Sequence, residues 1–196
     1  MHTNSKNNLI YKYSQISEWK IILIQLVFSI VMSDKWNVTE WGSLVIRQTA
    51  PINLKELHKS LYQWAQENNY FFIEKNFTEK IKSHGKEIEI VWDFQRKVTS
   101  FVRFNITIAI WAHSMNPVKK DDPEIIQGFI EIVFDSNIEM DWQNRWESSP
   151  FHKFLRRVYI YYIKKQHFLN YAGKCWEETY SLHALVKSHL NQFSLF

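Results

Sequence analysis

Alternation of apolar and polar residues through the middle of the chain limits its fold more than any other feature. Three runs show it, at residues 88–94, 102–110 and 128–142, and each keeps its apolar residues at even positions. Successive side chains of a β-strand point to opposite faces, so these runs predict strands buried on one face and exposed to water on the other. The apolar positions are Ile88, Ile90, Trp92, Phe94, Val102, Phe104, Ile106, Ile108, Ile110, Ile130, Ile132, Phe134, Ile138, Met140 and Trp142. Ser136 interrupts the last run, and we expect a bend or bulge there.

Short connections join these strands and predict how they pair. Turn residues lie at 83–85 and 99–100, and we interpret residues 115–124, "MNPVKKDDPE", as a polar loop. A parallel crossover needs a dozen or more residues, so neighbouring strands should be antiparallel.

Two further strands are predicted nearer the N-terminus. Residues 40–49 form the first, and we expect Pro51 to end it. Residues 71–81 form the second, with its buried face at odd positions. The apolar residues of that face are Phe71, Ile73, Phe77 and Ile81.

Between these two strands, "INLKELHKSLYQWAQENN" has the marks of an amphipathic helix. Asn53 can cap its N-terminus, and Glu56 stands three residues later, as in a capping box. Ile52 and Leu57 occupy the positions of a hydrophobic staple. The apolar stripe at helical spacing comprises Leu54, Leu57, Leu61, Trp64 and Ala65.

Two helices are predicted after the last strand. Ser149 is a suitable N-cap for the first, and Pro150 follows at the first helical position. Its predicted inner stripe is Phe151, Phe154, Leu155, Val158 and Tyr162. The second helix should run from about residue 166 to 192, with Gly173 as its weak point. Its predicted apolar side comprises Phe168, Ala172, Trp176, Leu182, Val186 and Phe193.

These elements predict an α+β fold. An antiparallel sheet of about five strands should pack on one face against three helices: the one in the N-terminal half and the two C-terminal ones, of which the last is long. We expect this packing because each element has one apolar face that must be covered. The sequence has only 4 Gly and 4 Pro, which favours long elements with few interruptions.

The N-terminal region contains the apolar run Ile21–Met32, "IILIQLVFSIVM". Twelve positions are too few to span a bilayer, which takes roughly 20 residues. We interpret residues 1–31 as an N-terminal extension and residues 32–196 as a single α+β domain. The alternatives are an export signal or anchor within residues 1–33, and a core helix. Whether translation starts at Met1 or Met32 is left open.

Cysteine usage bears on the compartment. Cys175 is the only cysteine, so the chain can form no intramolecular disulfide, which favours a reducing, cytoplasmic environment. Export or membrane association is the alternative, and residues 20–32 are the only segment through which we expect association with a membrane.

Two resemblances bear on the fold. The segments "KEIEIVWDFQRKVTSFVRFNITIAI" and "GFIEIVFDSNIEMDWQNRWESSPFHKFLRRVYIYYI" resemble an uncharacterised family of small α+β proteins from archaea with reduced genomes. The likeness covers about residues 40–193, implies that residues 1–31 are dispensable to the fold, and brings no known activity. In architecture, a curved sheet gripping a long C-terminal helix resembles the helix-grip fold of lipid-transfer and polyketide-cyclase proteins, which implies an apolar cavity between sheet and helix.

A basic segment is the main candidate for binding an anionic partner. Residues 141–174 contain seven Lys or Arg and only two acids, so the segment carries a charge of +5. Aromatic residues lie among these charges. Such a segment could bind the phosphates and stacked bases of a nucleic acid, an anionic membrane surface, or an acidic protein face. The candidate residues are Arg145, Lys153, Arg156, Arg157, Lys164 and Lys165.

Other reactive groups have simpler explanations. The carboxylates of the strands should form a solvated outer sheet face; they are Glu87, Glu89, Asp93, Glu131, Asp135, Glu139 and Asp141. Cys175 and His183 lie too far apart along one helix to act as nucleophile and base, and we expect a small buried cysteine. No HExxH pattern and no Cys–His set with zinc spacing occurs in the sequence, so we expect no cofactor, no metal and no enzymatic activity.

Two hypotheses of function follow. The first is a non-catalytic domain that binds a protein partner or an apolar small molecule between the sheet and the long helix. The large predicted inner residues favour a filled core and a protein partner. The alternative is a nucleic-acid-binding protein that uses the basic helix. The sequence leaves the oligomeric state open.

Overall fold

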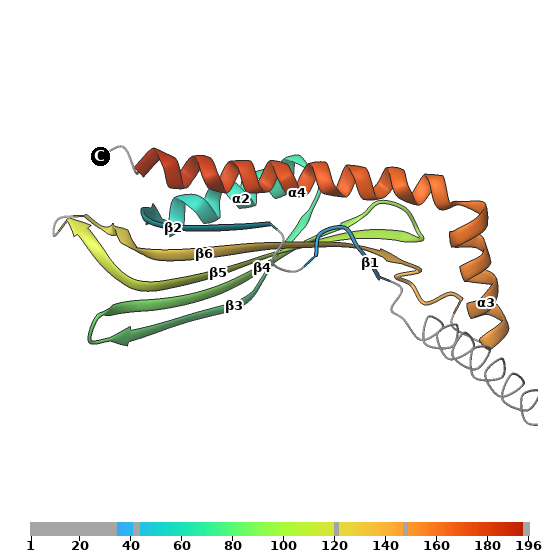
Figure 1. Ribbon diagram of the computed structural model, residues 1–196, viewed down its shortest axis with the longest axis horizontal. Coiled ribbons are helices and arrows are strands. Elements are labelled where there is room, and N and C mark those ends of the chain that lie inside the picture. The colour runs from blue at the N-terminus through green and yellow to red at the C-terminus, as the bar shows by residue number, and fades with distance from the viewer. Residues whose placement is uncertain (1–34, 41–43, 120–121, 147–148, 194–196) are drawn as a thin grey trace, which may run out of the picture. The chain divides into compact units, whose positions relative to one another are not determined.

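A six-stranded antiparallel sheet lies at the centre of the described part of the chain (Figure 1). The computed structural model describes residues 35–40, 44–119, 122–146 and 149–193, which belong to one compact unit, Lys35–Phe196. The predicted N-terminal extension, its apolar run and the alternatives for it lie outside the described residues. The elements in chain order are β1 (Lys35–Asn37), β2 (Leu44–Asn53), α2 (Leu54–Glu67), β3 (Phe71–Lys82), β4 (Gly85–Lys97), β5 (Val102–Lys119), β6 (Asp122–Met140), α3 (Pro150–Val158), a π-helical turn (Tyr159–Ile163) and α4 (Lys165–Phe193).

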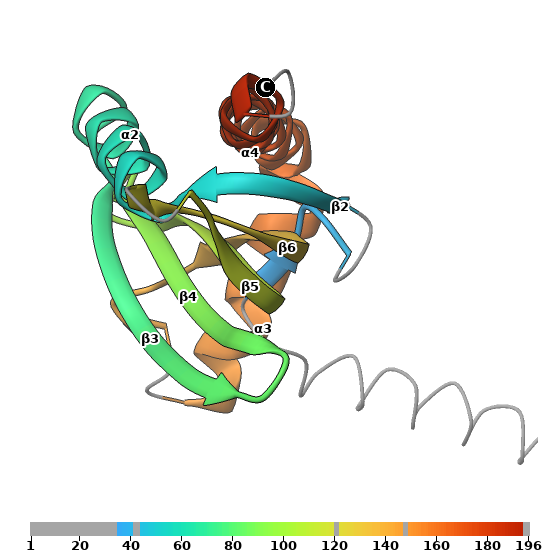
Figure 2. The ribbon, with the colours of Figure 1, turned by 90° about the vertical axis from the view of Figure 1, so that its left-hand side faces the viewer.

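The strand order is β1-β6-β5-β4-β3, and β2 also pairs with β6. β1 and β2 lie one after the other along the same edge of β6, opposite residues 137–139 and 125–134 respectively. The sheet is curved, and α2 and α4 lie on the same side of it (Figure 2). The predicted α+β class, the antiparallel pairing and the long last helix are confirmed.

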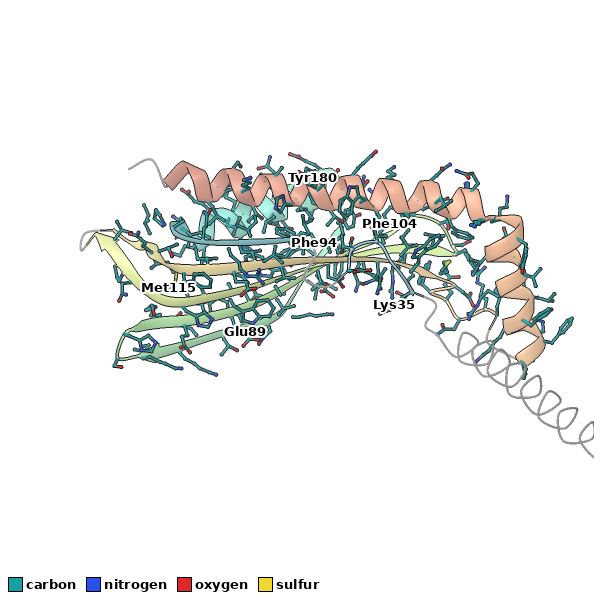
Figure 3. The ribbon with its side chains drawn as sticks, viewed as in Figure 1. Lys35, Glu89, Phe94, Phe104, Met115 and Tyr180 are labelled. Carbon is teal, nitrogen blue, oxygen red and sulfur yellow. The ribbon has the colours of Figure 1, made fainter. Side chains whose placement is uncertain are left out.

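The core lies between the helices and the inner face of the sheet. The even positions of β4, β5 and β6 are buried there as the alternation predicts (Figure 3). The ring of Phe94 contacts Trp64 of α2, and that of Phe104 contacts Tyr171 of α4; both phenylalanines are fully buried. The odd position Glu89 points to the opposite, outer face. The buried residues of α4 are Phe168, Cys175, Thr179, Leu182, Val186 and Leu190.

Trp176 was predicted to belong to this inner stripe and does not. Its side chain is 42% exposed. The buried residues of α4 recur at intervals of three, four and seven residues, so they share one side of the helix, and this side faces the sheet. Trp176 follows Cys175 directly and is rotated about 100° away from that side.

The helix predicted between the first strands is confirmed as α2. Asn53 caps it, and its Oδ1 accepts hydrogen bonds from the backbone N–H groups of Lys55 and Glu56, at 3.1 and 3.2 Å. The cap satisfies two N–H groups that no carbonyl of the helix can reach. Leu57 and Leu61 are fully buried against the sheet.

The segment predicted as a polar loop, residues 115–124, is mostly strand. β5 continues to Lys119 and β6 starts at Asp122, so the two strands form one long hairpin. A bulge hides this extension from the alternation, because Ser114 has φ +53° and the pairing register shifts after His113. Gly128 makes room for the bulge: a Cβ there would lie 2.5 Å from the carbonyl oxygen of His113.

Pro51 does not end β2, contrary to prediction. The strand continues to Asn53, and Pro51 pairs with Gln127 of β6. β2 is an edge strand, so one side of its backbone needs no partner in the sheet and a missing N–H is tolerated.

The inner side predicted for β3 is wrong for Phe71 and Ile73 and right for Phe77, which is nevertheless mostly exposed. Phe71 is 69% exposed and Ile81 is 82% exposed. A bulge between Glu74 and Asn76 adds one residue to the strand, so the inner side changes from even to odd positions. Before the bulge Phe72 lies opposite the core residue Phe94, and after it Phe77 lies opposite Ile90.

The predicted bend or bulge at Ser136 does not occur. The pairing of β5 with β6 is continuous there, with Ser136 opposite Ile106. Ser136 is fully buried, and its hydroxyl lies 3.2 Å from that of Thr39, which also accepts the Ser136 backbone N–H at 2.6 Å. A hydrogen-bond partner thus lets a polar residue occupy the inner face without distorting the strand.

Candidate functional site

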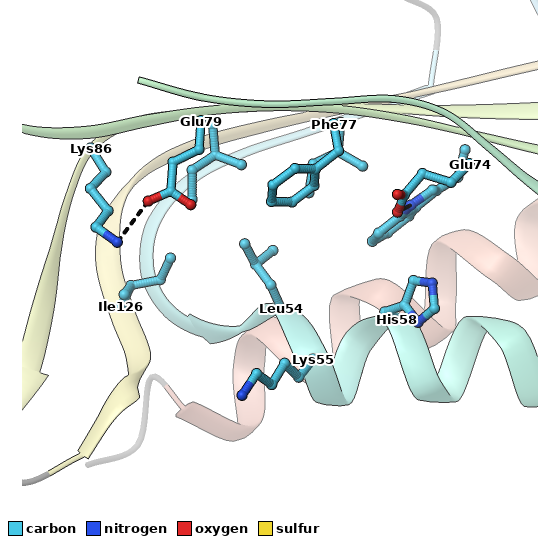
Figure 4. A pocket seen from close by; sticks show the side chains of 11 residues that line it. Leu54, Lys55, His58, Glu74, Phe77, Glu79, Lys86 and Ile126 are labelled. Atoms are coloured by element: carbon cyan, nitrogen blue, oxygen red, sulfur yellow. Dashed lines mark hydrogen bonds and ion pairs between the residues drawn. The ribbon is translucent and has the colours of Figure 1, made fainter. Parts of the chain in front are cut away.

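A cleft opens between the start of α2 and the inner face of β3 and β4 (Figure 4). Its volume is about 670 Å³, within the range of small-molecule sites in proteins. We call it the α2–β4 cleft. Its apolar lining comprises Leu54, Phe77, Ile88, Ile90, Trp92 and Ile126, and its ionisable lining comprises Lys55, His58, Glu74, Glu79 and Lys86.

The bulge in β3 helps to build this cleft. Because the strand gains one residue there, Phe77 lies opposite Ile90 on the inner face and lines the cleft. More than half of the Phe77 side chain is exposed. An apolar ring that remains open to water on the inner face is the kind of surface that an apolar ligand would cover.

Four of the five ionisable groups of the cleft stand at two ends of the apolar lining, and Lys55 lies beside Leu54 between these ends (Figure 4). At one end, Lys86 Nζ lies 2.7 Å from Glu79 Oε1 in an ion pair. At the other end, the Trp92 indole N–H donates to Glu74 Oε2 at 3.1 Å, and the edge of the His58 ring meets Trp92 at a centroid distance of 5.5 Å. The polar atom of the buried tryptophan is thus satisfied, and apart from Lys55 the lining between the two ends is apolar.

The predicted basic residues do not all lie at the surface. Arg145 and Lys153 are exposed, and so are Lys164 and Lys165 between the π-helical turn and α4. The side chain of Arg157 lies outside the described residues.

Arg156 is instead buried, with 4% of its surface exposed. Its guanidinium nitrogen Nη1 lies 3.2 Å from Asp141 Oδ2. Asp141 is itself buried, and its carboxylate also accepts the backbone N–H groups of Arg145 and Trp146. Arg156 therefore holds the turn after β6 to α3 and contributes little to the exposed basic surface.

The inner stripe predicted for α3 is wrong. The N-cap is as predicted, since Ser149 Oγ accepts the backbone N–H of His152. However, Phe151, Phe154 and Tyr162 are 65%, 59% and 84% exposed. The helix turns Arg156 toward the protein because Asp141 offers a buried carboxylate there, and its apolar side is left facing outward.

Of the carboxylates predicted to form a solvated outer sheet face, Asp141 is instead buried beside Arg156 after the end of β6, and Asp93 lies on that face but is buried. Most of the others are paired. Asp93 pairs with Lys75 and accepts a hydrogen bond from the Thr107 hydroxyl at 2.8 Å. Burial raises the pKa of Asp135 on the same face. The other pairs are Arg47–Glu131, Lys82–Glu87 and Arg103–Glu139. Within the described ranges no group of three His, Cys, Asp or Glu side chains is arranged to hold a metal ion.

Cys175 is a small buried cysteine of the core, as predicted. Burial and the nearby carboxylate of Glu178 raise the pKa of its thiol from 9.0 to about 12. At neutral pH the thiolate is therefore suppressed, and the residue is unsuited to nucleophilic catalysis.

This raised pKa predicts a pH dependence of stability. The unfolded thiol ionises at lower pH than the folded one, so the free energy of unfolding should be unaffected below pH 9.0 and fall as the pH rises toward 12. The slope from this group is about 1.4 kcal/mol per pH unit. Urea unfolding of wild type and Cys175→Ala at about pH 8 and about pH 10.5 measures it. The wild type should lose more stability than the variant between the two pH values, and equal losses would contradict the prediction.

The α2–β4 cleft was not predicted from the sequence. Its lining residues appear in the sequence as ordinary strand and helix positions, because apolar side chains of a cleft and of a core share the same alternation. The position of α2 over β3 and β4 decides which of them remain open to a ligand.

Two searches, one for membrane-spanning helices among the described residues and one for related proteins, gave no match. No helix within the described ranges combines the length and apolarity needed to cross a bilayer. Comparison of the sequence with protein-family models and with curated proteins found no match.

Proposed function

We propose that the protein is a non-catalytic binding protein that holds an apolar or amphipathic small molecule in the α2–β4 cleft. The observation that carries this proposal is a cleft of about 670 Å³ whose lining is mainly apolar between two polar ends. Covering its exposed apolar surface removes water from it, which yields about 25 cal/mol per Å² of apolar area.

The polar ends of the cleft favour an amphipathic ligand over a purely apolar one. The ion pair Lys86–Glu79 closes one end, while Lys55 and His58 of α2 line the other part of the opening. An apolar chain can lie along Ile88 and its neighbours with a polar group at the rim, where water and charged side chains remain available to it. Few polar contacts around a mainly apolar lining are typical of small-molecule sites.

A fluorescent fatty acid analogue tests the proposal. Titration of the full chain with 11-(dansylamino)undecanoic acid should give saturable binding and a blue shift of the dansyl emission. Leu54→Trp, which enlarges a side chain of the apolar lining, should weaken binding at least about tenfold, because tenfold corresponds to roughly 1.4 kcal/mol and the larger ring displaces several methylene groups of the ligand.

Leu169→Trp is the matched control. Leu169 lies on α4, is partly exposed and does not line the cleft, so this variant should bind the probe as the wild type does. Absence of saturable binding, or equal affinity of both variants and the wild type, would refute a ligand site in the cleft. Circular dichroism of both variants establishes that they are folded.

A further inference from the structure

We propose that α3 docks on an anionic lipid surface and attaches the protein to it peripherally. The contact would be made by the α3 surface, which we define as Phe151, Phe154, Leu155 and Tyr162 with the neighbouring cations Lys153, Lys164 and Lys165. This proposal is independent of the α2–β4 cleft, whose lining shares no residue with this surface.

The amphipathicity of α3 is directed away from the protein. A helix that packs on its own core buries its apolar residues and exposes its charges. Here Arg156 is buried while Phe151, Phe154 and Tyr162 are mostly exposed. Leaving a phenylalanine side chain in water instead of burying it costs about 1.5–3 kcal/mol. Several such residues on one side of a helix indicate a surface that is covered when the protein works.

Contacts on the inner side hold this orientation. The Arg156–Asp141 ion pair is buried, and Ile160 of the π-helical turn is also buried. The ring of Tyr159 stacks on that of Trp146 and meets the edge of Phe101, both at a centroid distance of 6.2 Å. The helix thus lies beyond the N-terminal end of α4 (Figure 1), and the exposure of Phe151, Phe154 and Tyr162 shows that its apolar side faces outward.

The charge around this surface selects an anionic partner. Residues 149–175 contain six Lys or Arg and no Asp or Glu. Lys153, Lys164 and Lys165 are exposed. Aromatic and aliphatic side chains bordered by lysines match the layered boundary of a membrane, where acyl chains take up the apolar groups and phosphates attract the cations.

An anionic lipid surface fits better than a protein or a nucleic acid. Lysine is depleted from protein interfaces, whereas it lies at the border of this patch. Nucleic acids are held by phosphate contacts and by rings on which bases stack. Leu155 on α3, which is partly exposed, offers no ring to a base but can enter an acyl layer.

Vesicle co-sedimentation tests the proposal. The full chain is mixed with phosphatidylcholine vesicles that contain one quarter phosphatidylserine, and with vesicles of phosphatidylcholine alone. Binding should be at least about tenfold stronger to the anionic vesicles, since each lysine near such a surface contributes about fivefold. Phe151→Ala/Phe154→Ala and Lys164→Glu/Lys165→Glu should each weaken binding to them at least about tenfold.

Matched controls are available on exposed positions elsewhere. Phe71→Ala removes a ring that is as exposed as Phe151 but lies on β3, and Lys59→Glu reverses an exposed charge on α2. Both should bind vesicles as the wild type does. The proposal is overturned if the wild type does not bind anionic vesicles, or if the controls lose as much binding as the α3 variants. Binding of single-stranded RNA that falls steeply with salt, without vesicle binding, would assign the surface to nucleic acid instead.

Discussion

Replacing Arg156 with alanine is expected to lower the free energy of unfolding by about 3–5 kcal/mol, the usual loss when one partner of a buried ion pair is removed. The guanidinium of Arg156 and the carboxylate of Asp141 are both almost completely buried and lie 3.2 Å apart. Without the arginine, a carboxylate would remain in the interior without its cation. Urea unfolding at neutral pH, followed by tryptophan fluorescence, measures the loss.

Lys153→Ala is the control for this prediction. Lys153 lies on the same helix, but its side chain is exposed, so its loss should change stability by no more than about 0.5 kcal/mol. A similar small effect of Arg156→Ala would show that the buried pair does not hold the helix. The comparison also bears on binding. Because Arg156 is buried, Arg156→Ala should change the affinity for an anionic partner only by changing the position of α3.

Replacing Glu178 with alanine is expected to lower the free energy of unfolding by about 2–4 kcal/mol, because the hydroxyl of the buried Tyr70 and the guanidinium of the partly buried Arg96 would lose their acceptor. The Glu178 carboxylate accepts hydrogen bonds from Arg96 Nη2 at 2.6 and 2.8 Å and from the Tyr70 hydroxyl at 2.6 Å. Arg96 also lies over the Tyr70 and Phe104 rings, at 4.7 and 5.2 Å from their centroids. This network joins α4 to β4 and to the segment after α2.

Two further variants serve as controls for the Glu178 prediction. Glu178→Gln keeps an acceptor oxygen and should lose less stability than Glu178→Ala, since only the charge is removed. Glu177→Ala changes the neighbouring exposed residue and should be neutral within about 0.5 kcal/mol. Equal stabilities of the two alanine variants in urea unfolding would show that the network does not join helix and sheet.

Burial and hydrogen bonding to Glu178 also raise the pKa of Tyr70 above its ordinary value of 10.0. The folded protein therefore holds this tyrosine neutral where the unfolded chain would ionise it. The stability that it contributes is complete below pH 10 and declines above it. This adds to the effect of Cys175 at high pH. Burial and Glu178, the larger causes of the raised Tyr70 pKa, remain in Cys175→Ala, and only the smaller contribution of Cys175 to that pKa is lost with the thiol.

The regular parts of the fold could be predicted from local sequence patterns. The inner faces of β4, β5 and β6 follow from strict alternation, and the starts of α2 and α3 follow from Asn53 and from Ser149 with Pro150. These features are local, since strand geometry sets a period of two and a helix start needs a side-chain acceptor within a few residues. The α+β class follows because each of these elements has one apolar face to bury.

The tertiary structure decided the features on which function depends. The bulge in β3 reverses the inner side of that strand and brings Phe77 into the cleft, and nothing in "EKN" at residues 74–76 marks it. The apolar residues of α3 share one side of the helix as the sequence predicts, but this side faces outward because the buried carboxylate of Asp141, 15 residues earlier in the chain, pairs with Arg156. Periodicity tells which residues share a face, whereas the direction of that face depends on partners that only the folded chain brings together.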